Sequence, residues 1–371
     1  MSTAPGTSGS APEVTMSDEL KRVVMLAPPL LSAAMALGML ACTSEETLTQ
    51  PGTAGDPASA ASSLVLASNT WTTKAPYPGP GLFGGSAAMA PNSAGQSIVY
   101  LFGGTDGAGG TVFPVHAYNV ATNTWTTKTS HVGVFNSNGV GKIGSRLYFS
   151  GGYNAVESPP SFTNLFWAYD YSHDQMVRKA DLPIFGAEGV TGVINGKLYV
   201  LPGACSGDRY PDLPGYCAVE PTRRFFRYDP ATNAWLGRRS APHFHRSGAG
   251  GVINGKFYVA GGFNIFQPVS QLDVYDPAAN TWTTLAPIPT AGRAIGAALG
   301  GKLFVIVGEG SELHSYVYNP ATNTWTTRAS PTLGHDAVVR VTLDGTSRLL
   351  AVGGAHGPNG DIPNDSELYT P

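Results

Sequence analysis

Seven polar side chains stand at or near the beginnings of apolar segments, and they are the residues of this chain best suited to bind a ligand. They are Asn136, Glu188, His245, Arg246, Arg293, His335 and Asp336. Guanidinium and imidazole groups bind carboxylates, whereas carboxylate and amide oxygens accept hydrogen bonds from hydroxyl or N–H groups. The alternative is that these groups pair with one another and with backbone carbonyls, as structural polar clusters do.

Two histidines two residues apart, His243 and His245, would lie on one side of a strand, where they could hold a metal ion. The sequence places no carboxylate or third histidine beside them, and a metal site needs more ligands than two. We interpret them as a loop histidine next to a candidate ligand-binding histidine. We therefore predict neither a metal site nor a cofactor.

The N-terminal segment has the order of a secretory signal. Lys21 and Arg22 precede an apolar run over residues 23–40, which ends in small residues before Cys42. This pattern favours Met16 over Met1 as the start of translation. The exit Met39-Leu40-Ala41-Cys42 resembles a bacterial lipobox, whose cysteine carries lipid after the signal is cut away. An ordinary signal peptide or an uncleaved membrane anchor is the alternative.

The resemblance to a lipobox implies an exported lipoprotein of the bacterial cell envelope, attached to a membrane through Cys42. We expect a signal peptide over residues 1–41, a lipidated cysteine and flexible tether over 42–62, and a folded domain over 63–371. The tether is rich in Ser, Thr, Ala, Gly and Pro, and it is too polar to bury a core. Thr43 differs from the aspartate that retains many lipoproteins at the inner membrane, which slightly favours the outer one.

With Cys42 assigned to lipid, Cys205 and Cys217 remain, on either side of a Gly- and Pro-containing loop. An exported protein lies in an oxidising compartment, so we predict a disulfide between them. A metal pair is the competing interpretation, but no further cysteine and no Cys-Xaa-Xaa-Cys spacing supports it.

Composition favours a β-protein and argues against nucleic acid as a partner. The chain carries a formal net charge of −3, and charged residues make up 13% of it, so it has no basic field. It contains 47 glycines and 29 prolines, and it lacks long helical apolar patterns. Short strands joined by many turns are therefore expected, in one ordered, monomeric domain.

Two phrases recur along the domain and show how such strands are organised. The first is a tyrosine, a turn and a tryptophan, in YNVATNTW (118–125), YDPATNAW (228–235), YDPAANTW (275–282) and YNPATNTW (318–325). The second is an apolar strand that ends in Gly-Gly, with six copies at 98–104, 146–152, 197–203, 256–262, 302–308 and 348–354, two of them degenerate. A period of about 50 residues is typical of propeller blades.

This order of strand, Gly-Gly, loop, Tyr, turn and Trp resembles the kelch repeat, over nearly all of residues 71–371. The resemblance implies an all-β, six-bladed kelch-type β-propeller. The repeated Tyr, Asn and Trp residues are expected to be scaffold, with the asparagine finishing a tight turn in a left-handed conformation. One blade departs from the pattern, because Met176 stands where a tryptophan is expected.

The last repeat is split between the two ends of the domain. The chain stops at Tyr369-Thr370-Pro371, whereas an isolated Asn69-Thr70-Trp71 stands near the start of the repeats. We predict that the N-terminal strand completes the C-terminal blade, because closure removes the exposed sheet edges of an open ring.

In such a propeller, the first strand of each blade lines the central channel. Aligning the starts of these strands brings the seven polar residues named at the outset to one channel mouth, where the first blade offers only Gly84 and Gly85. Kelch proteins commonly bind partners on this face. The resemblance therefore implies a binding or scaffold module for an unknown protein or carbohydrate.

The enzymatic alternative is an extracytoplasmic carbohydrate-active propeller similar to the sialic-acid mutarotases. Under that interpretation Glu188, His245, Arg246 and Arg293 would transfer protons and bind a carboxylate. This alternative rests on likeness of fold, which hosts many functions, so we assign no catalytic residue. We regard an enzyme as the less favoured interpretation.

Overall fold

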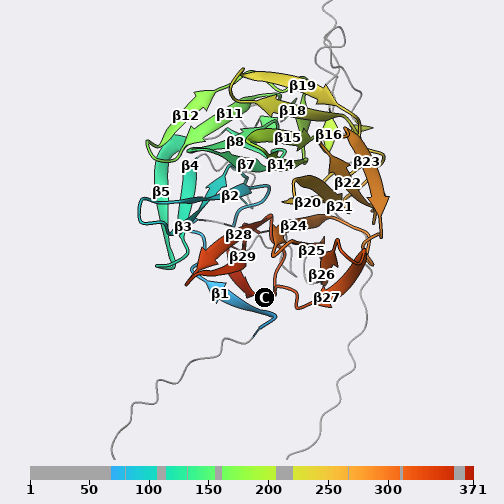
Figure 1. Ribbon diagram of the computed structural model, residues 1–371. Coiled ribbons are helices and arrows are strands. Elements are labelled where there is room, and N and C mark those ends of the chain that lie inside the picture. Colours follow the sequence, from blue (N-terminus) through green and yellow to red (C-terminus); the bar gives the residue numbers. More distant parts are fainter. Residues whose placement is uncertain are drawn as a thin grey trace, which may run out of the picture. The chain divides into compact units, whose positions relative to one another are not determined.

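The structure is a computed structural model in which residues 68–79, 81–106, 114–131, 133–154, 161–205, 220–265, 267–309, 312–354 and 364–371 are described. The chain divides into two compact units, residues 1–63 and 64–371, and the described residues all belong to the second. They form strands and turns, without a helix among them. These strands make six four-stranded antiparallel sheets set around a ring, the six-bladed arrangement expected from the repeats (Figure 1).

The blades follow one another along the chain, each listed from its channel strand outward. Blade one is β2(Ser86–Pro91), β3(Ser97–Phe102), β4(Pro114–Asn119) and β5(Thr124–His131), and blade two is β7(Val140–Ile143), β8(Arg146–Ser150), β11(Phe166–Asp170) and β12(Gln175–Arg178). Blade three is β14(Val190–Ile194), β15(Lys197–Leu201), β18(Phe225–Asp229) and β19(Ala234–Arg238), and blade four is β20(Ala249–Ile253), β21(Lys256–Ala260), β22(Leu272–Asp276) and β23(Thr281–Leu285).

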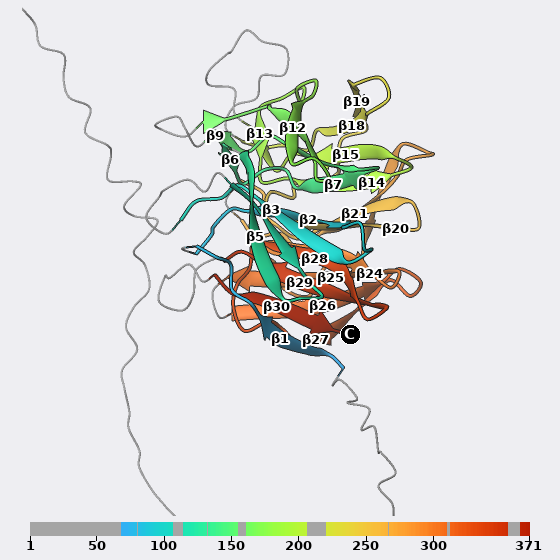
Figure 2. The ribbon, with the colours of Figure 1, turned by 90° about the vertical axis from the view of Figure 1, so that its left-hand side faces the viewer.

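Blade five is β24(Ala294–Leu299), β25(Lys302–Glu309), β26(Glu312–Asn319) and β27(Thr324–Arg328). Blade six is β28(Ala337–Leu343), β29(Thr346–Val352), β30(Ser366–Thr370) and β1(Thr70–Lys74). Two small sheets are built from the loops of blades one to three. They are β6(Val134–Phe135) with β9(Tyr153–Asn154) and β10(Ser161–Phe162), and β13(Gly186–Ala187) with β16(Ala204–Cys205) and β17(Glu220–Pro221). In the side view, β6 and β9 lie at the left-hand edge of the ring (Figure 2).

The N-terminal strand closes the ring, as the split repeat predicts. β1 pairs antiparallel with β30, with Trp71 opposite Tyr369 and Thr73 opposite Glu367. The indole of Trp71 packs on the rings of Tyr369 and Phe304, which belong to blades six and five. The first and last parts of the domain therefore share one blade and one hydrophobic cluster.

Small residues on the channel strands let the blades approach one another. A Cβ on Gly192 of β14 would lie 2.6 Å from the ring of Phe257 in blade four, and one on Gly141 of β7 would lie 2.3 Å from the side chain of Leu198 in blade three. The channel strands contact their neighbours in an unbroken cycle from β2 through β7, β14, β20 and β24 to β28 and back. Figure 1 shows these strands nearest the middle of the ring.

Each blade is also hydrogen-bonded to the preceding one at the outer rim, through a contact that we call the inter-blade clamp. In blade three the side-chain oxygen of Asn233, held at φ 51°, accepts hydrogen bonds from Tyr228 and from the backbone N–H of Ala180. The indole N–H of Trp235 donates to the carbonyl of the same Ala180, at 2.7 Å. The same three bonds recur around Asn123, Asn280, Asn323 and Asn69.

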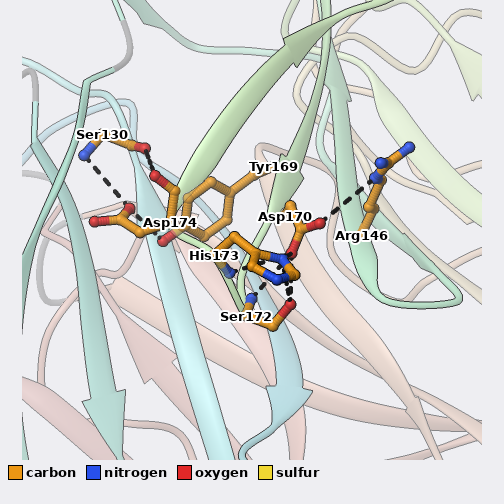
Figure 3. A network of polar contacts seen from close by, with 7 residues as sticks. All are labelled: Ser130, Arg146, Tyr169, Asp170, Ser172, His173 and Asp174. Atoms are coloured by element: carbon orange, nitrogen blue, oxygen red, sulfur yellow. Dashed lines mark hydrogen bonds and ion pairs between the residues drawn. The ribbon is translucent and has the colours of Figure 1, made fainter.

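Blade two builds its clamp from other groups, because Met176 has no N–H to donate. Asp174 stands at the asparagine position. Its carboxylate accepts hydrogen bonds from the hydroxyl of Tyr169 and from both the backbone N–H and the hydroxyl of Thr129. The hydroxyl of Ser130 donates to the carbonyl of Asp174 at 2.7 Å (Figure 3). Hydroxyl groups on blade one thus replace the missing indole.

The predicted signal peptide, the tether and Cys42 lie outside the described residues, so these stay predictions. Within the described part of the chain, no helix has the length and apolar character needed to cross a membrane.

Candidate functional site at the channel mouth

The first strands of the six blades enclose a cavity of about 520 Å³ along the axis of the ring. Its wall is mostly Gly, Ala and Val. Polar groups gather toward the mouth where these strands begin, and they include Asn136, Glu188, Ser247, Arg293 and Asp336. Lys142 lines it toward the far end of β7, and Arg340 lines it in the middle of β28.

A relay of backbone hydrogen bonds holds the mouth together. The N–H of Asn136 donates to Gly84 at 2.7 Å, Glu188 donates to Asn136 at 2.9 Å, and Ser247 donates to Glu188 at 2.8 Å. Asn136, Glu188 and Ser247 all take positive φ, between 50° and 56°, a conformation that few side chains adopt. The backbone of each residue is bonded to the corresponding residue of the preceding blade, so these strained positions serve the scaffold as well as the cavity.

Glu188 is the centre of the larger polar cluster. Arg246 donates to it through Nε at 2.6 Å and Nη2 at 3.0 Å, and Ser247 and Tyr153 each add a hydroxyl. Burial is the largest single effect and would raise the pKa of Glu188, but the Arg246 guanidinium and the hydroxyls of Ser247 and Tyr153 together outweigh it and hold the pKa below its ordinary value. The carboxylate is therefore ionised, and 13% of its side chain is exposed.

Arg246 lies at the rim of the mouth, with 35% of its side chain exposed. Its backbone pairs with that of Phe263 in the loop between β21 and β22. In the same loop Ile265 is 44% exposed, and it is one of two large apolar side chains exposed to that degree among the described residues. The rim thus presents a partly exposed guanidinium, and the loop whose backbone pairs with Arg246 carries an exposed apolar side chain, a combination that suits a macromolecular ligand.

Arg293 and Asp336 form the second cluster, which joins blades five, six and one. Arg293 Nη2 lies 3.0 Å from Asp336 Oδ1, and the other carboxylate oxygen accepts the backbone N–H of Gly85 at 3.3 Å. The carboxylate is 1% exposed. Burial raises the pKa of Asp336 to about 6, against the opposing effect of Arg293.

The two candidate histidines point into their blades and not into the cavity. Both ring nitrogens of His245 are used, Nδ1 with the carbonyl of Gly261 at 2.9 Å and Nε2 with Asp273 at 3.0 Å. His335 repeats the arrangement with the carbonyl of Gly353 and with Glu367. Each imidazole lies between a backbone carbonyl and a carboxylate, and each ring ties its Gly-Gly corner to the third strand of the blade.

His243 also reaches Asp273, which therefore lies between the two histidines of the His243-Phe244-His245 segment. Thr284 donates to the same carboxylate at 2.7 Å. Among the described residues, no group of three or more His, Cys, Asp or Glu side chains could hold a metal ion. The predicted disulfide involves Cys217, which lies outside the described residues.

The structure thus brings together Asn136, Glu188, Arg293 and Asp336 at the cavity, places Arg246 on its rim, and turns His245 and His335 away. Sequence reasoning missed the acids behind the histidines. A signal existed, because Asp273 and Glu367 stand two residues before the repeat tyrosines Tyr275 and Tyr369, where most blades carry an aromatic ring.

Comparisons with known proteins agree with this architecture. The Kelch motif family model matches residues 246–289. Kelch-like protein 38 of Danio rerio is 26% identical over 41% of this chain and 23% of its own length, and Kelch-like protein terF of Aspergillus terreus is 28% identical over 53% and 43%. The chain therefore spans less than half the length of these curated relatives.

Among solved structures, that of YjhT has a TM-score of 0.60 and 18% identity, and the match covers 78% of this chain and 95% of that one. At this identity the likeness concerns the fold alone. The motif match, the kelch-like relatives and the six closed blades support a kelch-repeat propeller, a fold typical of protein-interaction scaffolds.

Proposed function

We propose that this propeller is a binding or scaffold module that recognises a protein or a glycan through its channel-mouth face. The observation that carries the proposal is the pairing at the mouth. Arg246 is held by Glu188 in a two-bond ion pair, yet a third of its side chain stays exposed, and the loop that pairs with its backbone carries the exposed Ile265. Preorganised arginines are common centres of binding energy.

The same pairing disfavours acid–base catalysis. Glu188 has a lowered pKa, and its oxygens already accept hydrogen bonds from Arg246, Ser247 and Tyr153. The imidazoles of His245 and His335 are buried with both nitrogens occupied. A general base needs a free lone pair and reach to its substrate. The oxygens of Glu188 accept four hydrogen bonds, and the two imidazoles do not line the cavity. A carbohydrate-active enzyme is therefore the less favoured function.

The test is a glycan array together with cross-linking pull-down, using the full chain solubilised in a mild detergent. Arg246→Ala and Ile265→Ser change the rim without altering the blade cores. We expect either substitution to weaken the binding of a true ligand about tenfold or more. Lys142→Ala, at the other end of the channel, is the matched control and should bind normally. A ligand that binds both rim variants as tightly as the unaltered protein would refute this face as the site.

We further propose that the domain is held at the cell envelope by lipid on Cys42, with the outer membrane favoured. The support is the lipobox-like exit Met39-Leu40-Ala41-Cys42 after an apolar run. Growth with a clickable palmitate analogue should label the protein, and Cys42→Ser should abolish the label and release the protein from membranes. Equal labelling of the Cys42→Ser variant would contradict lipidation at this residue.

A further inference from the structure

One guanidinium that lines the central cavity uses little of its hydrogen-bonding capacity. Arg293 stands directly before β24, and 16% of its side chain is exposed. Among the described residues, its only hydrogen-bond acceptor is Asp336, which Nη2 reaches at 3.0 Å. A guanidinium has five N–H donors, so four donors of Arg293 have no acceptor in the described part of the chain.

Asp336 is the counter-charge of Arg293, and it is almost wholly enclosed. Its carboxylate is 1% exposed, and blade one offers it the backbone N–H groups of Gly84 and Gly85. Arg293 is the one charged side chain bonded to it among the described residues. The adjacent His335 points instead to the carbonyl of Gly353 and to the carboxylate of Glu367. Burial outweighs the effect of Arg293 and raises the pKa of Asp336 to about 6.

The lining of the cavity carries more positive than negative charge. Its charged residues are Lys142, Glu188, Arg293, Asp336 and Arg340. When Asp336 is protonated, these are three cations and one carboxylate, and that carboxylate is already bonded to the guanidinium of Arg246. A concave site with an excess of one charge attracts ions of the opposite charge, and low-dielectric walls strengthen the attraction. An anion is therefore the ligand that suits this cavity.

The protonation state of Asp336 decides whether Arg293 is available to an anion. With Asp336 ionised, the guanidinium is neutralised, and an entering anion meets a like charge beside it. With Asp336 protonated, the guanidinium is a largely buried charge without a counter-charge, which is unfavourable. An anion in the cavity would supply the counter-charge and accept hydrogen bonds from the remaining donors.

We propose that Arg293 binds a small anion, or the anionic group of a larger ligand, inside the channel mouth when Asp336 is protonated. Carboxylate, sulfate and phosphate groups share the chemistry that a guanidinium recognises. For a larger ligand the inference rests on the function proposed above, and it adds the charge that this ligand presents to the mouth. Binding should strengthen as the pH falls.

The test is isothermal titration calorimetry of the full chain in mild detergent, with sodium sulfate at constant ionic strength. Sulfate stays fully ionised between about pH 5 and about pH 7.5, so a change of affinity across this range comes from the protein. We expect about thirtyfold tighter binding at the lower pH, because binding requires a proton on one group with a pKa of about 6. At the higher pH, buffers of different ionisation enthalpy should show uptake of about one proton for each sulfate bound.

Two variants separate the anion site from its proton. Asp336→Asn keeps the shape of the side chain and an acceptor for Gly85, so it should bind sulfate equally at both pH values, with the affinity of the unaltered protein at the lower pH. Arg293→Gln should bind sulfate about tenfold more weakly at the lower pH, because the charged donor is lost. Thermal unfolding of each variant checks that it is folded.

The matched controls are one cation inside the cavity and one outside it. Lys142→Ala removes a charge that lines the same cavity without a bond to Asp336, so it should keep the pH dependence. Arg239→Ala removes an exposed arginine directly after β19, on the outer edge of blade three, and should leave sulfate binding unchanged.

Equal sulfate affinity of the unaltered protein at the two pH values would overturn the proposal, as would the same pH dependence in Asp336→Asn. Loss of binding in Arg239→Ala but not in Arg293→Gln would place the anion outside the channel and would also overturn it. A ligand recovered through the rim distinguishes the two sources of the anion. If sulfate displaces that ligand, the anionic group belongs to it; if sulfate binds without displacing it, the site takes a free anion.

Failure of this proposal is distinguishable from failure of the proposed function. Sulfate titration needs no macromolecular ligand, and Arg246 and Ile265 are not required for it. A ligand that ignores both rim variants would refute the mouth face as the macromolecular site, whereas the proton-linked sulfate site would stand.

Discussion

The phenol of Tyr369 donates a 3.0 Å hydrogen bond to the side-chain oxygen of Asn69, which lies 300 residues earlier in the chain. In the inter-blade clamps around Asn123, Asn233, Asn280 and Asn323, the same bond spans five residues. The side chain of Asn69 also accepts a hydrogen bond from the N–H of Ala329, and the indole N–H of Trp71 donates one to the carbonyl of Ala329. Closure of the ring therefore reproduces the ordinary clamp with parts taken from both ends of the domain.

Trp71→Ala should destabilise the whole propeller, because it removes one clamp bond and the packing on Tyr369 and Phe304. We expect the free energy of unfolding to fall by about 3 kcal/mol, the low end for a partly buried tryptophan. Chemical denaturation measures this directly. Thr73→Ala, on an exposed position of the same strand, should change it little. Similar losses from both variants would argue against closure through Trp71.

Asp174→Ala should weaken the contact between blades one and two, because the carboxylate accepts hydrogen bonds from the hydroxyl of Tyr169 and from the backbone N–H and hydroxyl of Thr129. Hydrogen bonds to charged groups contribute about 1.5 to 3 kcal/mol each when buried, and this site is partly exposed, so a total loss of about 2 kcal/mol is expected. Asp174→Asn restores the residue of the other clamps and should lose less than half of that. Denaturant titrations of the two variants give the comparison, and equal losses would show that the charge is decisive.

Asp336 should make stability depend on pH in an unusual direction. Burial raises its folded pKa from 3.8 to about 6, so between these values the folded protein binds the proton more tightly than the unfolded chain. Its contribution to the free energy of unfolding is then complete below pH 3.8 and is lost as the pH rises through about 6. In Asp336→Asn this slope should be absent.

The measurement is the difference in unfolding free energy between the unaltered protein and Asp336→Asn across that pH window. Subtraction removes the carboxylates with lowered pKa, such as Asp273 and Glu367, whose contributions are instead lost as the pH falls. Arg293→Ala should extend the slope to higher pH, since the guanidinium is the charge that favours ionised Asp336. Parallel pH curves for the unaltered protein and Asp336→Asn would contradict the raised pKa.

Gly192→Ala should destabilise the packing between blades three and four, because its Cβ would lie 2.6 Å from the ring of Phe257. Overpacking of this kind costs about 1 to 3 kcal/mol. Gly237→Ala, where the new Cβ meets nothing within 4 Å, is the matched control and should be neutral or slightly stabilising. Thermal unfolding followed by circular dichroism distinguishes them, and an unchanged midpoint for Gly192→Ala would mean that the channel strands can move apart.

Much of the fold could be predicted because repetition multiplies weak local signals. One Tyr-turn-Trp phrase is ambiguous, but copies at a steady spacing predict the blades, and the isolated Asn69-Thr70-Trp71 predicts the closing strand. The scaffold role of the repeat asparagines was also expected. Their second bond, to the backbone of the neighbouring blade, was not expected, because the acceptor and donor are 37 to 53 residues apart in the chain.

The candidate site divides in the same way. Alignment of strand starts correctly brings Asn136, Glu188, Arg293 and Asp336 to the cavity, since a residue's place along a repeated strand follows from the repeat. The direction in which a side chain points does not follow from the repeat. His245 and Arg246 are neighbours in sequence, yet the first turns inward to Asp273 and the second outward to Glu188.

The sequence by itself therefore determined the number of blades, their closure and the chain positions that lie at the channel mouth. Only the tertiary structure decided which of these side chains face the cavity and which are neutralised by a partner. The physical reason is that these properties depend on partners from other strands and blades. A side chain's direction, burial and pKa follow from what packs against it, and local sequence does not contain that information.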